Sequence, residues 1–235
     1  MLMRKPRSYA EVYNELDGEI VNVFRVVRDR GDELRRALEL TPFAREEFLL
    51  SYEPSDDPLE QARRTITRSF MGFGSAAVCG QVSGFRGYSG SNRSTTPAQD
   101  WRNYPDSLPA VIDRLRGVVI EQRDATEVMR QHDGPETLHY VDPPYHHDTR
   151  NRGDRNSVKS YKHEMSDDQH RDLAAVLKDM QGMVILSGYR LQLYDDLYAK
   201  WNRLDRAAHA DGARDRVESL WLSPNVHANQ MRMTL

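Results

Sequence analysis

The sequence has few of the features that mark secreted or membrane-bound proteins. Its single cysteine, Cys79, excludes an internal disulfide framework and any zinc site built from several cysteines. Its longest apolar runs, such as residues 183–186, have the length of a strand and fall far short of the roughly 18 residues of a membrane span. The basic start of the chain is followed by no apolar stretch, so it lacks the pattern of a signal peptide. These absences predict a soluble, cytoplasmic protein that does not bind membranes.

A large excess of charge of one sign is also missing. The 33 Lys and Arg residues are balanced by 36 Asp and Glu residues, which gives a net charge of -3 and excludes a basic surface over the whole protein. Hydrophobic residues make up only 38% of the chain and charged ones 29%, so the core must lie beneath a heavily charged surface. With 235 residues, a single catalytic domain is the simplest expectation.

Residues 61–105 depart from this balance. The stretch contains six basic residues and the single acid Asp100, a local charge of +5. All six are arginines with aromatic side chains between them, a combination suited to phosphate contact and base stacking. We therefore expect a nucleic-acid patch made of Arg63, Arg64, Arg68, Arg86, Arg93 and Arg102. The alternative is an ordinary solvated loop whose arginines pair with acids of the protein itself.

Short apolar runs alternate with segments of helical spacing over most of the chain. We predict strands at residues 10–14, 118–122, 137–141 and 183–186, and helices beginning near residues 18, 108, 126, 170 and 193. Residues 41–70 are charged and only weakly helical, and the glycine-rich stretch 71–96 is expected to be a loop or hairpin. Residues 203–209 and 217–222 have no helix between them, which indicates an antiparallel pair at a sheet edge. The expected fold class is α/β, with a mostly parallel sheet covered by helices.

The strongest motif is Asp142-Pro143-Pro144-Tyr145, directly after the predicted strand 137–141. This tetrapeptide arises by chance on the order of once in a thousand chains of this length. Open α/β sheets bind their ligands at the carboxyl ends of parallel strands, where the motif is predicted to lie. The motif therefore predicts an active site, and the alternative is a proline turn that merely ends a strand.

The residue types suit chemistry at the exocyclic amino group of a nucleobase. Such a nitrogen is a poor nucleophile because its lone pair is delocalised, so the catalyst must hold it with two acceptors. We expect the Asp142 carboxylate and the Pro143 carbonyl to be these acceptors, with both prolines, Pro143 and Pro144, fixing the backbone in advance. Tyr145 would offer a flat face to a flipped-out base.

The sequence resembles the Dam-like class of DNA adenine-N6 methyltransferases, particularly the phage-type members. The resemblance lies in the tetrapeptide, in Tyr161 and in residues 12–17, 182–189, 193–197 and 218–224. It implies a Rossmann-like methyltransferase sheet, S-adenosylmethionine as cofactor and double-stranded DNA as partner of a monomeric enzyme. It also implies that residues 1–30 and 106–235 form the catalytic domain and that residues 31–105 are an insertion, mainly helical and loop, for recognition of the DNA target.

Three acids are candidates for binding the cofactor. The resemblance puts Glu15 at the place where family members carry an Asp for the ribose hydroxyls, although a structural acid of the turn is the alternative. Asp124 follows strand 118–122 and either contacts the adenine end of the cofactor or caps the next helix. Asp142 would contact the cofactor as well as the target base. No metal site is expected.

The family's glycine-rich cofactor loop has no counterpart here. The resemblance puts Met1 near the end of the helix after that loop, so about thirty residues, one strand–loop–helix unit, are expected to be missing. The alternatives to an adenine methyltransferase are a truncated, inactive DNA-binding remnant, or an enzyme acting on cytosine N4 or on RNA.

Three further features are given no chemical role. His146, His147 and Asp148 are adjacent residues that rarely converge on one ion, so we interpret them as a solvated or DNA-facing loop. Ser187 lacks the strained turn of a hydrolase nucleophile. Cys79 is interpreted as incidental, because transfer to an amino nitrogen needs no thiol.

Overall fold

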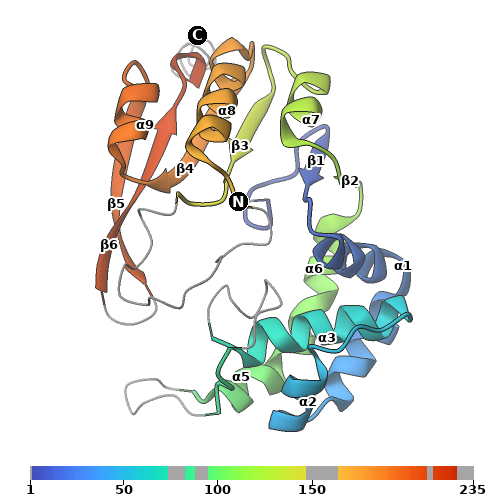
Figure 1. Ribbon diagram of the computed structural model, residues 1–235. Coiled ribbons are helices and arrows are strands. Elements are labelled where there is room, and N and C mark those ends of the chain that lie inside the picture. Colours follow the sequence, from blue (N-terminus) through green and yellow to red (C-terminus); the bar gives the residue numbers. More distant parts are fainter. Residues whose placement is uncertain (1, 74–82, 88–94, 147–163, 211–213, 227–235) are drawn as a thin grey trace. The chain divides into compact units, whose positions relative to one another are not determined.

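A computed structural model describes residues 2–73, 83–87, 95–146, 164–210 and 214–226 of the chain (Figure 1). The chain divides into two compact units, one formed by Met1–Arg123 with Ser160–Lys162, the other by Asp124–Lys159 with His163–Leu235. This boundary separates two compact parts of the chain. It differs from the expected boundary between a catalytic domain, residues 1–30 and 106–235, and a DNA-recognition insertion, residues 31–105.

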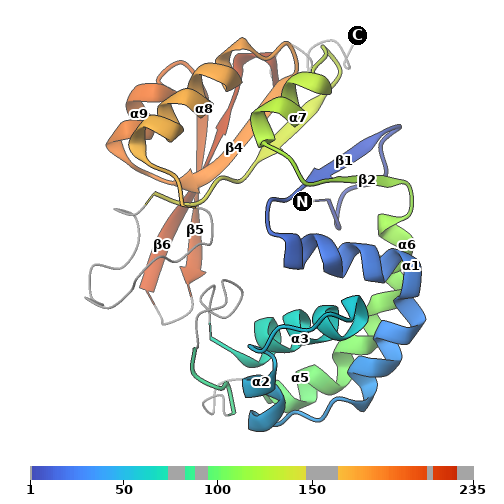
Figure 2. The ribbon, with the colours of Figure 1, turned by 45° about the vertical axis from the view of Figure 1, so that its right-hand side comes forward.

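The first unit pairs a small parallel sheet with a group of helices (Figure 2). Its strands pair in register from Glu11↔Val118 to Asn14↔Glu121. The elements are β1 (Glu11–Asn14), α1 (Gly18–Leu40), α2 (Arg45–Leu50), α3 (Pro58–Met71), α5 (Pro97–Asn103), a 3-10 turn (Tyr104–Ser107), α6 (Leu108–Leu115) and β2 (Val118–Glu121). The core lies among the helices, where Leu34, Phe48 and Met71 are at most 1% exposed.

Helix α1 begins where the sequence predicts and runs further than expected. The Asp17 side chain caps it by accepting from the Glu19 backbone N–H at 3.0 Å. Arg30 has non-helical dihedrals (φ -139°, ψ 36°), so the helix kinks there and then continues to Leu40. The kink falls on the residue expected to end the first catalytic segment.

The prediction that residues 41–70 are only weakly helical is wrong for α3. This helix has a complete N-terminus, because Asp57 accepts from the Leu59 backbone N–H at 3.1 Å and Pro58 occupies the first turn. Its charged residues pair with acids, as described below for Arg63 and Arg64. The charged residues made the amphipathic pattern of α3 hard to recognise, because the acids that pair with its arginines lie partly outside the helix.

The second unit holds a four-stranded sheet of order β3-β4-β6-β5. Its elements are α7 (Ala125–Gln131), β3 (Leu138–Val141), α8 (Asp167–Asp179), β4 (Met183–Tyr189), α9 (Gln192–Leu197), β5 (Asn202–Ala210) and β6 (Arg214–Leu222). β3 and β4 are parallel, whereas β6 runs antiparallel to both β4 and β5. The prediction of an antiparallel pair at one edge is confirmed, and the long β5–β6 ribbon is visible in Figure 1.

The two faces of this sheet differ. Val184, Leu186 and Trp221 pack with residues of α7, α8 and α9 in one buried cluster. The register puts Leu138, Tyr140 and Leu204 on the opposite face, where their exposed fractions are 42%, 43% and 51%. In the second unit, the described helices therefore cover a single face of the sheet.

The protein is mixed α/β, as predicted, and its strands are divided between the two units. In the described part of the chain they form a two-stranded and a four-stranded sheet, each with its own hydrogen bonds. Two of the three strand pairings in the larger sheet are antiparallel. Apolar spacing locates a strand but does not specify its partner, so the division of the described strands between two sheets does not follow from the sequence pattern. No helix among the described residues is long and apolar enough to cross a membrane.

Candidate active site

The tetrapeptide lies at the carboxyl end of β3, as the sequence predicts. Because β3 and β4 are parallel and Val141 pairs with Leu186, the next residues along, Asp142 and Ser187, lie side by side. The Ser187 hydroxyl donates to Asp142 Oδ1 at 2.7 Å and lies 3.3 Å from the Val141 carbonyl oxygen. Asp142 itself is exposed, so its carboxylate is anchored on one side and accessible on the other.

Two tyrosine rings contact each other at the strand ends that carry Asp142. The half-buried rings of Tyr145 and Tyr189 pack edge to face, with centroids 4.7 Å apart and planes at 67°. Tyr189 is the last residue of β4, so both rings lie at the carboxyl end of the parallel pair. This places aromatic surface at the same strand ends as Asp142, and stacking of a nucleobase requires such a surface.

A buried polar chain supports the residue that follows the motif. His146 is 4% exposed, and its Nε2 lies 2.7 Å from Asp167 Oδ1 at the start of α8. Its ring packs against that of His170, whose Nδ1 lies 3.0 Å from the Tyr194 hydroxyl. Burial, and to a smaller degree the negative charge of Asp142, raise the pKa of Tyr194 well above its usual range. His146 is thus held by two side chains of α8, Asp167 and His170, and the second of these bonds to Tyr194 of α9.

Glu15 follows β1 directly, at the carboxyl end of the smaller sheet. Its Oε1 accepts from the Asp17 backbone N–H at 3.0 Å, which is the contact of a structural acid in the turn. The described contacts of its side chain involve this oxygen alone, so Oε2 remains for a ligand. Nearby, Asn14 exchanges hydrogen bonds of 2.9 and 3.1 Å with the Arg123 backbone and joins the ends of the two strands.

Asp124 caps α7. Its Oδ1 accepts from the backbone N–H groups of Thr126 at 2.8 Å and Glu127 at 3.2 Å, and from the Thr126 hydroxyl. The hydroxyl, together with the two backbone donors, lowers the pKa of Asp124. Every described hydrogen bond of this side chain uses Oδ1, and the residue is exposed. The capping alternative is therefore correct, and it leaves Oδ2 for the cofactor role.

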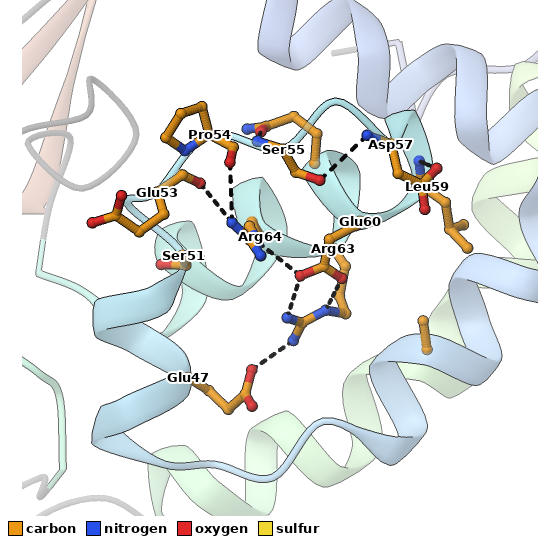
Figure 3. Close-up of polar contacts among 12 residues, drawn as sticks. Glu47, Ser51, Glu53, Pro54, Ser55, Asp57, Leu59, Glu60, Arg63 and Arg64 are labelled. Atoms are coloured by element: carbon orange, nitrogen blue, oxygen red, sulfur yellow. Dashed lines mark hydrogen bonds and ion pairs between the residues drawn. The ribbon is translucent and has the colours of Figure 1, made fainter.

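Two of the six arginines form ion pairs within the first unit (Figure 3). Arg63 pairs with Glu60 at 2.7 Å and with Glu47 at 2.8 Å, and Arg64 pairs with Glu60 at 2.7 Å. The two arginine side chains are only 11% and 15% exposed. The Arg63 and Arg64 guanidinium groups lower the pKa of Glu60 to about 2.

A third arginine, Arg68, is buried in the core of this unit. It pairs with Glu19 and donates to the Ser51 carbonyl oxygen at 2.9 Å, and its side chain is 3% exposed. Arg102 is exposed in the last turn of α5, and the half-buried Arg86 follows the bridge between Gly72 and Phe85. Arg93 lies outside the described residues. The paired-arginine alternative thus describes three of the six predicted residues.

Ser187 and Tyr189 are the residues that sequence reasoning missed at this site. Ser187 was considered only as a nucleophile, because the register that aligns it with Asp142 becomes known only from the structure. Among the described residues, no group of three His, Cys, Asp or Glu side chains could hold a metal ion. His147, Asp148 and Cys79 lie outside the described residues.

An acceptor carboxylate beside paired aromatic rings, at the carboxyl end of parallel strands in an α/β unit, suits an enzyme that modifies the amino group of a nucleobase. A family model of the D12 class of N6 adenine-specific DNA methyltransferases matches residues 2–210, and the chain belongs to this family. It is an adenine-specific DNA methyltransferase, and nothing in the match favours cytosine, RNA or an inactive remnant. Members of the family generally use S-adenosylmethionine as methyl donor and DNA as substrate. A search of curated proteins found no match.

Proposed function

We propose that this protein methylates N6 of adenine in double-stranded DNA at the site formed by Asp142, Pro143, Pro144 and Tyr145. The observation that carries the proposal is the exposed Asp142 carboxylate at the carboxyl end of β3, which the described side chains anchor through Oδ1. The neighbouring pair of Tyr145 and Tyr189 supports it, because a flipped adenine needs a flat apolar surface beside its amino group.

In this mechanism the protein prepares the amino nitrogen for attack. Asp142 and the Pro143 carbonyl oxygen each accept one of the two N6 hydrogens, which favours the pyramidal nitrogen with a localised lone pair. S-adenosylmethionine, when bound, would supply a methyl group from its positively charged sulfur and would leave as the neutral thioether S-adenosylhomocysteine. Asp142 also accepts the proton that the nitrogen loses as it gains its fourth bond. Pro143 is buried and Pro144 half-buried, so the turn that carries these acceptors is fixed before reaction.

Glu15 would bind the ribose hydroxyls of the cofactor, Asp124 would bind its adenine end, and Asp142 would contact it as well as the target base. The donor set fits, because each of the two outer acids uses one carboxylate oxygen in its own turn and keeps the other. A Rossmann-like arrangement, with residues 1–30 and 106–235 as catalytic domain and 31–105 as DNA-recognition insertion, is part of the same proposal.

For DNA contact, the proposal now rests on Arg86, Arg93 and Arg102. Arg63, Arg64 and Arg68 are weaker candidates, because a guanidinium that already pairs with a carboxylate must break that pair to meet a phosphate. We further propose that the protein acts as a monomer on DNA.

The test is transfer of a labelled methyl group from S-adenosylmethionine to a duplex, followed by identification of the methylated base. We expect N6-methyladenine from the wild-type chain. Asp142→Ala should reduce turnover by about a hundredfold to a thousandfold while DNA affinity stays within twofold. Asp205→Ala is the matched control, because Asp205 is also a carboxylate that accepts from a serine of the same sheet. No N6-methyladenine from the wild type, or near-normal turnover of Asp142→Ala, would contradict the proposal.

A further inference from the structure

We infer that Ser187 is a positioning residue for the reaction: its hydroxyl holds Asp142 Oδ1 so that Oδ2 faces the adenine amino group. The inference rests on the proposed function of Asp142. It assigns the serine neither nucleophilic nor acid–base chemistry, and it concerns only the orientation of the carboxylate.

The position of Ser187 is fixed by the sheet. β4 is flanked by β3 on one side and by β6 on the other, and Ser187 pairs with Leu220 of β6. The serine is 7% exposed, whereas Asp142 is exposed. A hydroxyl held on an inner strand can therefore fix a carboxylate that extends beyond the end of a neighbouring strand.

The hydroxyl has a single proton and two nearby acceptors. Asp142 Oδ1 lies at 2.7 Å and the Val141 carbonyl oxygen at 3.3 Å, so the proton goes to the closer and charged acceptor. Among the described residues, Ser187 supplies the one side-chain hydrogen bond to this carboxylate.

Orientation matters because the last torsion of an aspartate side chain is broad and has roughly two-fold symmetry. Without a donor, the carboxylate samples many angles, and an acceptor that is misaligned with the N6 hydrogen loses its preorganisation. The serine restricts this torsion before substrate binds. Its removal should thus slow the chemical step and leave DNA binding nearly unchanged.

A merely structural serine would behave differently, and Ser219 provides the comparison. Its hydroxyl donates to Asp205 Oδ1 at 2.8 Å, and it is 0% exposed. It lies on β6 opposite Gly188, so its side chain points to the other face of the same sheet from Ser187. The two serines make the same type of bond, but only one of them contacts Asp142.

The experiment measures kcat, KM for DNA and thermal unfolding for Ser187→Ala, Ser187→Cys, Ser187→Thr and Ser219→Ala. We expect kcat to fall about tenfold to a hundredfold in Ser187→Ala, the range for one hydrogen bond to a charged group, with KM within twofold. Ser187→Cys keeps the volume with a weak donor and should show a similar loss. Ser187→Thr retains the hydroxyl and should restore most of the rate.

The outcomes separate this inference from the proposed function. Near-normal kcat in folded Ser187→Ala, or an equal loss of kcat in Ser219→Ala, would overturn the role of Ser187. If Asp142→Ala is inactive in the same assay, the role of Asp142 would still stand. Near-normal turnover of Asp142→Ala would instead overturn the proposed function, and the positioning role with it.

Discussion

The arginines of the first unit have two kinds of surroundings. Arg68 is 3% exposed and paired with Glu19, so its removal leaves a carboxylate without its counter-charge and a cavity in the core. We expect Arg68→Ala to lower the free energy of unfolding by about 3 to 5 kcal/mol. Urea denaturation checks this value, and a loss below about 1 kcal/mol would mean that the pair contributes little.

Arg102 should give the opposite result. It is exposed on α5, and the described residues offer it no ion pair, so Arg102→Ala should change the unfolding free energy by less than about 0.5 kcal/mol. If it meets a phosphate, its loss should weaken binding to all DNA sequences and reduce the log–log salt slope by about 0.9. A salt titration of DNA affinity decides, and an unchanged slope would remove Arg102 from the DNA surface.

At this scale the sequence predicted the place of Asp142 but not its partner. A tetrapeptide after an apolar strand fixes where the carboxylate lies, because both belong to one continuous segment. The bond from Ser187 depends on the register between strands 45 residues apart, which no local pattern specifies. The same holds for Arg68 and Glu19, which are 49 residues apart in the chain.

Asp124, at the start of α7, has two roles that can be tested separately: capping the helix and the proposed binding of the cofactor. Asp124 caps the helix, so Asp124→Ala should cost about 1 kcal/mol of unfolding free energy. Asp124→Ser retains a capping oxygen and should restore stability to within about 0.5 kcal/mol. If the second carboxylate oxygen binds the cofactor, both variants should lose affinity for S-adenosylmethionine. Thermal unfolding and calorimetric titration test the two roles, and full affinity in both variants would leave only the cap.

The first strand is tied to α6 by a pH-sensitive pair. Hydrogen bonds from Arg114 at 2.7 and 2.8 Å, and a contact from Lys5, lower the pKa of Glu11 to about 2 from the ordinary 4.5. A lowered pKa means that the carboxylate stabilises the fold above pH 4.5 and loses this effect as pH falls toward 2. Glu11→Gln should therefore be least stable, relative to wild type, near neutral pH. Unfolding curves from pH 7 to 2 test this, and a constant difference would contradict it.

Strand and helix positions followed from the sequence better than their pairing did. β5 and β6 were predicted as an antiparallel pair because no helical segment separates them. β3 was predicted as a strand because it carries a compact apolar run. The division into two sheets was not predicted, since partner choice depends on long-range contacts. α3 was predicted as only weakly helical, because its charged residues obscure the helical pattern until their partners in space are known.

For the whole molecule, local charge arithmetic overstated the basic patch. The +5 of residues 61–105 omits Glu19, Glu47 and Glu60, which precede that stretch in sequence and pair with three of its arginines. A count along the chain cannot include an acid that approaches only after folding. The DNA-binding charge is therefore smaller than the sequence indicates, and the salt slope should be correspondingly shallow.

The exposed apolar side chains of the larger sheet have a consequence for colloidal behaviour. Leu138, Tyr140 and Leu204 present apolar surface to solvent, and a net charge of -3 gives molecules of this size little mutual repulsion. Static light scattering should thus give a negative second virial coefficient at moderate salt. Leu204→Lys should shift the coefficient upward, whereas Leu204→Met, which keeps the apolar surface, should not. An unchanged coefficient in the lysine variant would mean that the attraction between molecules arises at another part of the surface.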